Sequence, residues 1–249
     1  LVMKILVIGD SCIDEFIYCD IERICPEAPV PVLKPIRSQQ NPGMASNVVA
    51  NLQTLGVEVN LVTNTSKIVK TRYVDSRSGQ MVIRVDKNDK CKKIDWSNKY
   101  LQHPSSIFDA VIISDYCKGF LDVEDIKHIS ANFNCPIFLD TKKQLGEWSV
   151  DIDFIKINEF EHKNNFKIIS NYPDLLNKLI VTRGSKGCEY KNQLYPVPKV
   201  SIKDVSGAGD TFLASLVVNY LKTNNILIAI EFANECATKV VQKRGVTTI

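Results

Sequence analysis

The chain has 249 residues, of which 45% are hydrophobic and 24% charged, a composition typical of a soluble globular protein with a sizeable core. Its 31 basic and 28 acidic residues are interspersed and give a net charge of +3, which argues against a nucleic-acid partner. No apolar run approaches the roughly 20 residues of a membrane span, so no membrane partner is expected. Eight cysteines without a C-x-x-C pair favour free thiols and a cytoplasmic location over a zinc or disulfide framework.

Short apolar runs alternate with helix-like segments along the chain. The runs predict buried strands at 5–8, 59–62, 110–113, 136–139, 154–157 and 179–181. The periodic segments predict helices at 45–55, 123–132, 174–178, 211–222 and 226–243. This alternation predicts one α/β domain over residues 1–249, with a mainly parallel sheet whose carboxyl ends collect the ligands.

Two segments do not follow the alternation. Residues 12–36 and 68–86 contain strand-like stretches in which polar and apolar residues are mixed. They fit either a small separate sheet that covers the site or ordinary surface hairpins. Both interpretations remain open at this point. The three histidines, His103, His128 and His162, fit no catalytic pattern, and surface positions are expected for them.

The stretch from Asp204 to Phe212, Asp-Val-Ser-Gly-Ala-Gly-Asp-Thr-Phe, is the most informative part of the chain. Gly207, Ala208 and Gly209 allow a tight turn into a helix N-terminus, where backbone N–H groups and the helix dipole attract an anion. A carboxylate at Asp210 suits a base that takes a proton from a hydroxyl while the N–H groups stabilise a transferred phosphoryl group. The alternative is an acidic residue that only compensates the helix dipole.

Further motifs make the chain resemble the ribokinase-like (PfkB) carbohydrate kinases almost from end to end. They are the glycine-containing loop Asn41–Asn47, the Asn-x-x-Glu motif at Asn158–Glu161, the turn Thr182–Gly187, the signature Asp204–Asp210, and Ala233-Asn234 followed by Gly245. Three stretches resemble the heptose 7-phosphate kinases within this family, namely Arg23–Val32, Arg77–Asp86 and Ser114–Gly119. The resemblance implies a three-layer α/β/α ribokinase-like fold in which 12–36 and 68–86 form a small β-sheet lid.

The resemblance also implies roles for single residues. Asp210 is the implied catalytic base, and Gly207, Ala208 and Gly209 form the anion hole. The implied substrate-binding residues are Asp14, Gly43, Met44, Asn47, Arg84, Lys118 and Lys142. The implied ATP-binding residues are Asn158, Glu161, Thr182, Gly184, Gly187 and Asn234.

Asn158 and Glu161 are also the candidate Mg²⁺ ligands, directly or through water. The alternative for this pair is a capping box, because an Asn followed three residues later by a Glu is typical of a helix start. For Asp14 and Asn47, the alternatives are the end of a strand and a helix cap. The resemblance further implies ATP with Mg²⁺, allows a monovalent cation such as K⁺, and suggests a homodimer formed through the lid. A small sheet that stands off the main domain is expected to expose apolar residues such as Phe16, Val30 and Val32, which the second subunit would cover.

The chain departs from the family pattern in several places. Met44 stands where a second glycine is usual, and Asp140-Thr141-Lys142 replaces the Asp-Pro-Lys of the heptose kinases. The segment between Val62 and Lys70 is short, and a kinase domain without a fused nucleotidyltransferase domain is expected.

The sequence therefore predicts an ATP-dependent sugar kinase that phosphorylates D-glycero-β-D-manno-heptose 7-phosphate at O1. The alternatives are a related kinase for another sugar, sugar phosphate or nucleoside, or an inactive binding relative.

Overall fold

The structure is a computed structural model that describes residues 2–102, 107–243 and 245–249. The strands are β1 (Lys4–Gly9), β2 (Ser11–Ile24), β3 (Pro31–Met44), β4 (Glu58–Val62), β5 (Ile68–Asp75), β6 (Met81–Lys87), β7 (Ala110–Asp115), β8 (Ile137–Thr141), β9 (Phe154–Asn158), β10 (Leu179–Thr182), β11 (Cys188–Tyr190) and β12 (Gln193–Tyr195). The α-helices are α1 (Ala45–Thr54), α2 (Lys99–Gln102), α3 (Val123–Asn132), α4 (Glu159–Asn171), α5 (Ala208–Thr223) and α6 (Ile226–Val240).

The central sheet has eight strands in the order β12-β11-β10-β9-β8-β7-β1-β4. The six strands from β10 to β4 are parallel, and β11 and β12 are antiparallel additions at one edge. All six apolar runs predicted as strands lie in this parallel part. They read as continuous apolar runs because helices cover both faces of the sheet.

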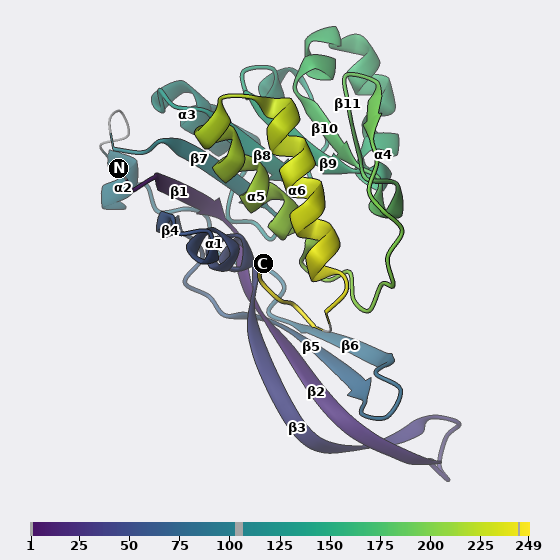
Figure 1. The fold of residues 1–249 in the computed structure, drawn as a ribbon. Coiled ribbons are helices and arrows are strands. Elements are labelled where there is room, and N and C mark those ends of the chain that lie inside the picture. The colour runs from purple at the N-terminus through teal and green to yellow at the C-terminus, as the bar shows by residue number, and fades with distance from the viewer. Residues whose placement is uncertain (1, 103–106, 244) are drawn as a thin grey trace.

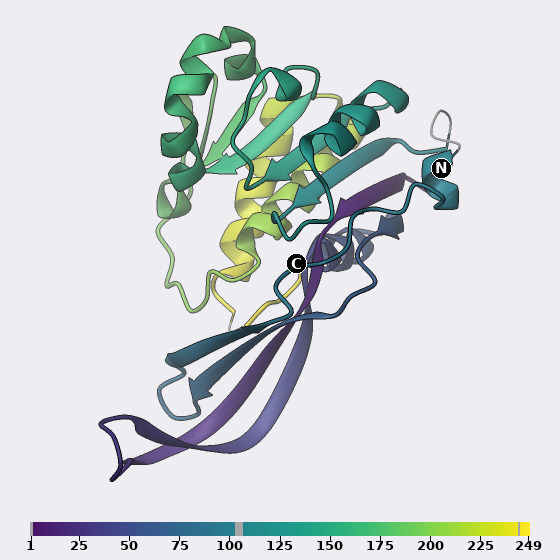
Figure 2. The same ribbon diagram turned by 180° about the vertical axis from the view of Figure 1, so that it is seen from behind.

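Alternate residues of these strands enter two separate hydrophobic cores. Ile5 and Val7 of β1 pack with α1, α5 and α6 on one face, whereas Leu6 and Ile8 pack with α3 and α4 on the other. Figure 1 shows α1, α5 and α6 in front of the sheet, and Figure 2 shows α3 and α4 on the opposite side. The three-layer α/β/α fold is therefore confirmed.

The second sheet has the strand order β3-β2-β5-β6 and projects from the carboxyl-end side of the central sheet (Figure 1). We call these four strands the lid. A separate sheet forms, rather than isolated hairpins, because β2 pairs in parallel with β5 and so joins the two segments. Only Asp10 separates β2 from β1, so the lid continues directly from the central sheet.

The helices differ from the prediction in two places. Residues 159–171 form the α-helix α4, and the predicted helix at 174–178 is a short 3₁₀ helix at Pro173–Asn177. His128 is exposed, His162 is half-buried, and His103 lies outside the described residues. In the described part of the chain, no helix has the length and apolar character needed to cross a membrane.

Candidate active site

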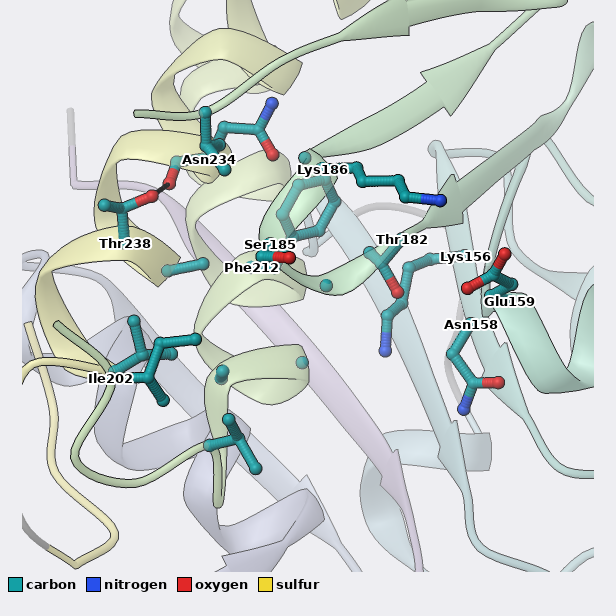
Figure 3. A pocket seen from close by; sticks show the side chains of 18 of the residues that line it. Lys156, Asn158, Glu159, Thr182, Ser185, Lys186, Ile202, Phe212, Asn234 and Thr238 are labelled. Atoms are coloured by element: carbon teal, nitrogen blue, oxygen red, sulfur yellow. Dashed lines mark hydrogen bonds between the residues drawn. The ribbon is translucent and has the colours of Figure 1, made fainter. Parts of the chain in front are cut away.

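A cavity of about 1080 Å³ lies beside the carboxyl ends of β9 and β10 and the N-terminus of α5 (Figure 3). Five of the predicted ATP-binding residues line it, namely Asn158, Thr182, Gly184, Gly187 and Asn234. In Figure 3, Lys156, Asn158 and Thr182 lie on one side of the cavity and Ile202, Asn234 and Thr238 on the other. The side at the ends of β9 and β10 is polar and carries Lys156, whereas apolar side chains such as Val200, Ile202 and Ala237 also line the side near α6.

Part of the cavity wall comes from a loop that the sequence analysis did not assign. Its contributing residues are Val197, Pro198, Lys199, Val200 and Ile202, between β12 and α5. The loop has no periodicity, so pattern analysis offers no signal for its role. Its apolar side chains give the cavity a surface suited to a planar base.

The predicted anion hole lies at the start of α5. Gly207 has a left-handed φ of 79°, and Ala208 and Gly209 line the cavity. A Cβ on Gly207 would lie 2.6 Å from Nδ2 of Asn47, and one on Gly209 would lie 2.9 Å from Nζ of Lys156. Glycine is therefore favoured at Gly207, where the left-handed φ adds to the close contact, whereas a larger residue at Gly209 would require the flexible Lys156 side chain to shift.

Asp210 follows immediately, in the first turn of α5, with only 4% of its surface exposed. Its Oδ2 accepts a hydrogen bond from Nδ2 of Asn47 over 2.8 Å, and its Oδ1 accepts one from the hydroxyl of Tyr116 over 2.7 Å. Burial raises the pKa of Asp210 to about 6, although both hydrogen bonds and nearby Lys156 oppose the rise. A carboxyl with a pKa close to neutrality is suited to general-base chemistry.

Lys156 is a site residue that the sequence analysis missed. Its side chain is only 5% exposed, lines the cavity, and donates to Oδ2 of Asp140 over 2.7 Å. The signal was present in the sequence, because Lys156 interrupts the apolar strand Phe154–Ile157 with a charge. A lysine buried in a strand needs a partner or a ligand. Asp140 supplies the partner, and the cavity leaves room for an anion.

Asn158 and Glu161 form the capping box that the sequence allowed as an alternative. The backbone N–H of Glu161 donates to Oδ1 of Asn158 over 2.8 Å, and the N–H of Asn158 donates to Oε2 of Glu161 over 2.8 Å. The remaining oxygen, Oε1, accepts a hydrogen bond from Lys142. Both carboxylate oxygens of Glu161 are therefore engaged with protein groups.

These contacts decide how the site fits Mg²⁺. Within the described ranges, no group of three or more His, Cys, Asp or Glu residues has the geometry to hold a metal ion. Oδ1 of Asp140 is buried without a hydrogen-bond partner among those residues, and Nζ of Lys142 lies 4.0 Å from it. A single unpaired carboxylate oxygen is suited to Mg²⁺ only if the ion keeps most of its water ligands and is held mainly by the nucleotide phosphates.

The predicted sugar-binding residues Asp14, Gly43 and Asn47 lie where the lid meets the central domain. Asp14 on β2 forms an ion pair with Arg72 of neighbouring β5, a residue that the sequence analysis did not identify. A Cβ on Gly43 would lie 2.3 Å from Oδ2 of Asp14, so the glycine leaves space for that carboxylate. Asn47, also predicted to bind sugar, donates a side-chain N–H to Asp210.

Met44 has a backbone conformation that normally suits glycine. Its φ and ψ are 60° and −132°, values that residues with a Cβ rarely adopt. The side chain is 3% exposed and packs with Cys12, Ile68 and Tyr116. Met44 therefore fills the space where the lid joins the central sheet. It lies next to Tyr116, whose hydroxyl contacts Asp210, the predicted catalytic base.

The three basic residues among the predicted substrate-binding residues do not form one cluster. Arg84 is exposed on β6 and bonds both oxygens of Asp86 over 2.8 and 2.7 Å, and Lys118 donates to Asp89 over 2.6 Å. Lys142 instead lines the cavity, where it pairs with Glu161. Arg84 lies on the lid strand β6 and Lys118 pairs with Asp89 just after it, a surface that we call the lid border, whereas Lys142 lies at the cavity.

Comparison with known proteins agrees with this geometry. The family model for pfkB family carbohydrate kinases matches residues 63–249. The chain is 30% identical to the bifunctional protein HldE of a Nitratiruptor species, over 98% of this chain and 63% of that protein. It is 32% identical to the HldE protein of Helicobacter acinonychis, over 97% and 63%. The chain thus spans less than two thirds of these curated relatives.

Solved structures show the same fold. Phosphofructokinase-2 from Escherichia coli, described in complex with potassium, has a TM-score of 0.74 at 14% identity, over 99% of this chain and 94% of that one. Ribokinase from Thermotoga maritima has a TM-score of 0.71 at 19% identity, over 98% and 94%. Arabidopsis thaliana ribokinase, complexed with ribose and ATP, has a TM-score of 0.69 at 16% identity, over 98% and 94%. This chain therefore belongs to the pfkB family of carbohydrate kinases, phosphotransferases whose acceptor is an alcohol group.

Proposed function

We propose that this kinase transfers the γ-phosphoryl group of ATP to O1 of D-glycero-β-D-manno-heptose 7-phosphate, giving the 1,7-bisphosphate. The observation that carries the proposal is Asp210, a buried carboxylate next to the glycine turn that lines the cavity, hydrogen-bonded by Asn47 and Tyr116. The heptose is supported by the resemblance of Arg23–Val32 and Ser114–Gly119 to heptose kinases and by the similarity to HldE proteins.

The nucleotide would occupy the cavity with its base near Ile202 and Asn234 and its phosphates at the start of α5. The backbone N–H groups at the helix start then face the transferred phosphoryl group. Lys156, held by Asp140, supplies a positive charge at the same place. Phosphoryl transfer depends mainly on alignment and charge stabilisation, and these groups are suited to both.

Mg²⁺ would be held through water near Asn158, Asp140 and Glu161, and it would neutralise charge on the phosphates. Asp210 accepts the proton of the sugar hydroxyl as the new O–P bond forms. Its two hydrogen bonds fix the carboxylate in one orientation, so that no rotation is needed during the reaction.

The 7-phosphate would bind at the lid border, away from Asp210. Arg84 and Lys118 are the candidate ligands there. Asp86 has a lowered pKa, mainly because of its hydrogen bonds from Arg84, with Lys70 and Lys118 also contributing. This border therefore carries several cations whose carboxylate partners a phosphate would replace.

The lid supports a homodimer. Its apolar exposed residues are Ile24, Val30, Ile36, Met81, Val82, Ile83 and Val85. Every residue of the edge strand β6 is exposed, and an uncovered apolar edge favours pairing with a second chain. The expectation that Phe16 also needs cover is wrong, because it is buried against Val74 and Val246 within the same chain.

A substrate panel tests the proposal. Turnover with ATP and Mg²⁺ is measured on heptose 7-phosphate, unphosphorylated heptose, hexose 6-phosphates and nucleosides. We expect kcat/KM for heptose 7-phosphate to exceed that for unphosphorylated heptose by about 10-fold or more, because one charge-assisted bond is worth about 1.5–3 kcal/mol. Equal kcat/KM values for the two heptoses would reject a phosphorylated sugar as the substrate. Preferential turnover of a nucleoside would instead identify the protein as a nucleoside kinase. Arg84→Ala and Lys118→Ala, tested separately, identify the phosphate ligand as the variant in which the preference shrinks.

A further inference from the structure

Tyr116 connects the proposed base to the cavity wall. It follows β7 directly, within the Ser114–Gly119 stretch, and its ring lines the cavity. Its hydroxyl donates to Oδ1 of Asp210 over 2.7 Å. The bond joins residues 94 positions apart in the sequence, so it forms only in the folded chain.

The backbone of Tyr116 is itself held in place. Its N–H donates to Oδ2 of Asp10 over 2.7 Å, and Asp10 is fully buried between β1 and β2. Nζ of Lys70 lies 5.6 Å and Nζ of Lys142 5.3 Å from the ring centroid. The backbone of Tyr116 is therefore fixed, and Lys70 of the lid and Lys142, just after β8, lie near its ring. The hydroxyl of this ring points toward Asp210.

The polar groups that face Asp210 come from five elements. Asn47 of α1 and Tyr116 donate hydrogen bonds to it, and Lys156 of β9 lowers its pKa through charge. Asp140 of β8 raises that pKa through charge. The charge of Asp210 in turn raises the pKa of Cys12 on β2 and of Lys142, just after β8. Burial, and then the charge of Asp210, raise the pKa of Tyr116 well above its ordinary value. Tyr116 therefore stays protonated and acts on the carboxylate only as a donor.

We propose that Tyr116 is a positioning residue, whose hydroxyl holds the Asp210 carboxylate in one orientation and favours its ionised form. This inference rests on the proposed function, because it assumes that Asp210 acts as a base. A hydrogen bond to the charged form of a carboxyl stabilises that form. Without it, the buried carboxyl would retain its proton to a higher pH, and less of the enzyme would be active below neutrality.

Tyr116→Phe tests the inference, because it keeps the ring and removes only the hydroxyl. Tyr190→Phe is the matched control, since the buried Tyr190 also donates its hydroxyl, to the carbonyl oxygen of Asn177 over 2.9 Å, far from the site. The first readout is the ¹³C titration of the aspartate carboxyl carbons by NMR, with the Asp210 signal assigned through Asp210→Asn. The second is the pH profile of kcat/KM for the sugar phosphate.

We expect Tyr116→Phe to raise the titration midpoint of Asp210 by about one pH unit, and Tyr190→Phe to leave it unchanged. kcat/KM should fall about 10-fold at about pH 5.5 but less than about 3-fold at about pH 8.5. An unchanged midpoint in Tyr116→Phe, or an equal loss of activity at all pH values, would overturn the inference.

The NMR titration needs no substrate, so it separates the two proposals. If the wild type phosphorylates no sugar in the panel while Tyr116→Phe still shifts the Asp210 midpoint, the proposed function fails and the positioning role stands. If the wild type is active and the midpoint does not move, only the role of Tyr116 is rejected.

Discussion

The side chain of Asn47 donates a hydrogen bond to Asp210 over 2.8 Å, although the two residues lie 163 positions apart. Asn47 belongs to the first turn of α1 and Asp210 to the first turn of α5, and both side chains are buried. The contact joins the start of α1, which follows the lid strand β3, to the start of α5, where the phosphates of the nucleotide are proposed to bind. It thereby links the two halves of the proposed active site.

Asp210→Asn is expected to lower kcat by about 10²–10⁴, because the amide cannot accept the proton. The fold should persist, since an Asn oxygen can still accept from Asn47 while its NH₂ donates to the hydroxyl oxygen of Tyr116. Turnover is measured at saturating ATP and sugar phosphate. Near-normal turnover would rule out Asp210 as the base.

The same variant also tests the raised pKa of Asp210 through protein stability. The folded-state value of about 6 lies above the ordinary value of 3.8, so stability from this group is present below about pH 4 and lost as the pH rises through about 6. The free energy of unfolding of the wild type, relative to Asp210→Asn, should fall by at most about 3 kcal/mol between about pH 4 and pH 7. Denaturant unfolding of both proteins across this range provides the measurement, and a constant difference would contradict the raised pKa.

Lys156→Gln is expected to lower kcat/KM for ATP by about 10²–10³, because it removes a charge beside the transferred phosphoryl group. Gln retains a donor for Asp140, so that carboxylate is not left without a partner. Lys186→Gln is the matched control, since Lys186 also lines the cavity but is exposed. Equal effects of the two substitutions would argue that Lys156 only balances Asp140.

Glu161→Gln and Glu161→Ala separate metal binding from helix capping. Gln retains the acceptor of the capping box but loses the charge, so a higher Mg²⁺ requirement with a nearly unchanged Tm is expected. Ala also removes the cap and should cost about 0.5–2 kcal/mol of stability. Kinetics over a range of Mg²⁺ concentrations and thermal unfolding measure the two effects. An unaltered Mg²⁺ requirement in both variants would leave Glu161 with a structural role alone.

Met44→Gly should be more stable than Met44→Ala, by about 1 kcal/mol or more. Both variants lose the packing of the buried side chain, but only glycine removes the backbone strain at a φ of 60°. The usual order applies at Val48 inside α1, where Gly should be less stable than Ala by about 1 kcal/mol. Chemical denaturation of the four variants measures both differences, and the usual order at Met44 would contradict the strained conformation.

Ile83→Lys is expected to shift the protein from dimer to monomer at micromolar concentration, because it places a charge on the exposed edge strand of the lid. Ile228→Lys, at an exposed position of α6, is the control and should leave the molar mass unchanged. Light scattering measures both. A monomeric wild type at the same concentration would reject the lid-mediated dimer.

Local signals in the amino-acid sequence were sufficient to predict the six parallel strands, the helices α1, α3, α5 and α6, and the tight glycine turn at the start of α5, but not α2, α4, β11 or β12. These signals are the apolar runs of buried parallel strands and the glycines of the Gly207–Asp210 turn. The Asn158–Glu161 spacing likewise predicted two reciprocal capping bonds without deciding their role. The lid was suggested by its mixed strands, although the pairing of β2 with β5 joins segments more than 50 residues apart.

The partners of the polar side chains, in contrast, depend on the three-dimensional arrangement of the elements. Lys156 contacts Asp140, Arg72 contacts Asp14, and Lys142 contacts Glu161, and these partners come from different strands or helices. The contact of Asn47 with Asp210 was not predicted, and Phe16 was expected to be exposed but is covered by the C-terminal segment at Val246. The physical reason is that buried polar and apolar groups select partners through the packing of distant elements, which periodicity within one segment does not encode.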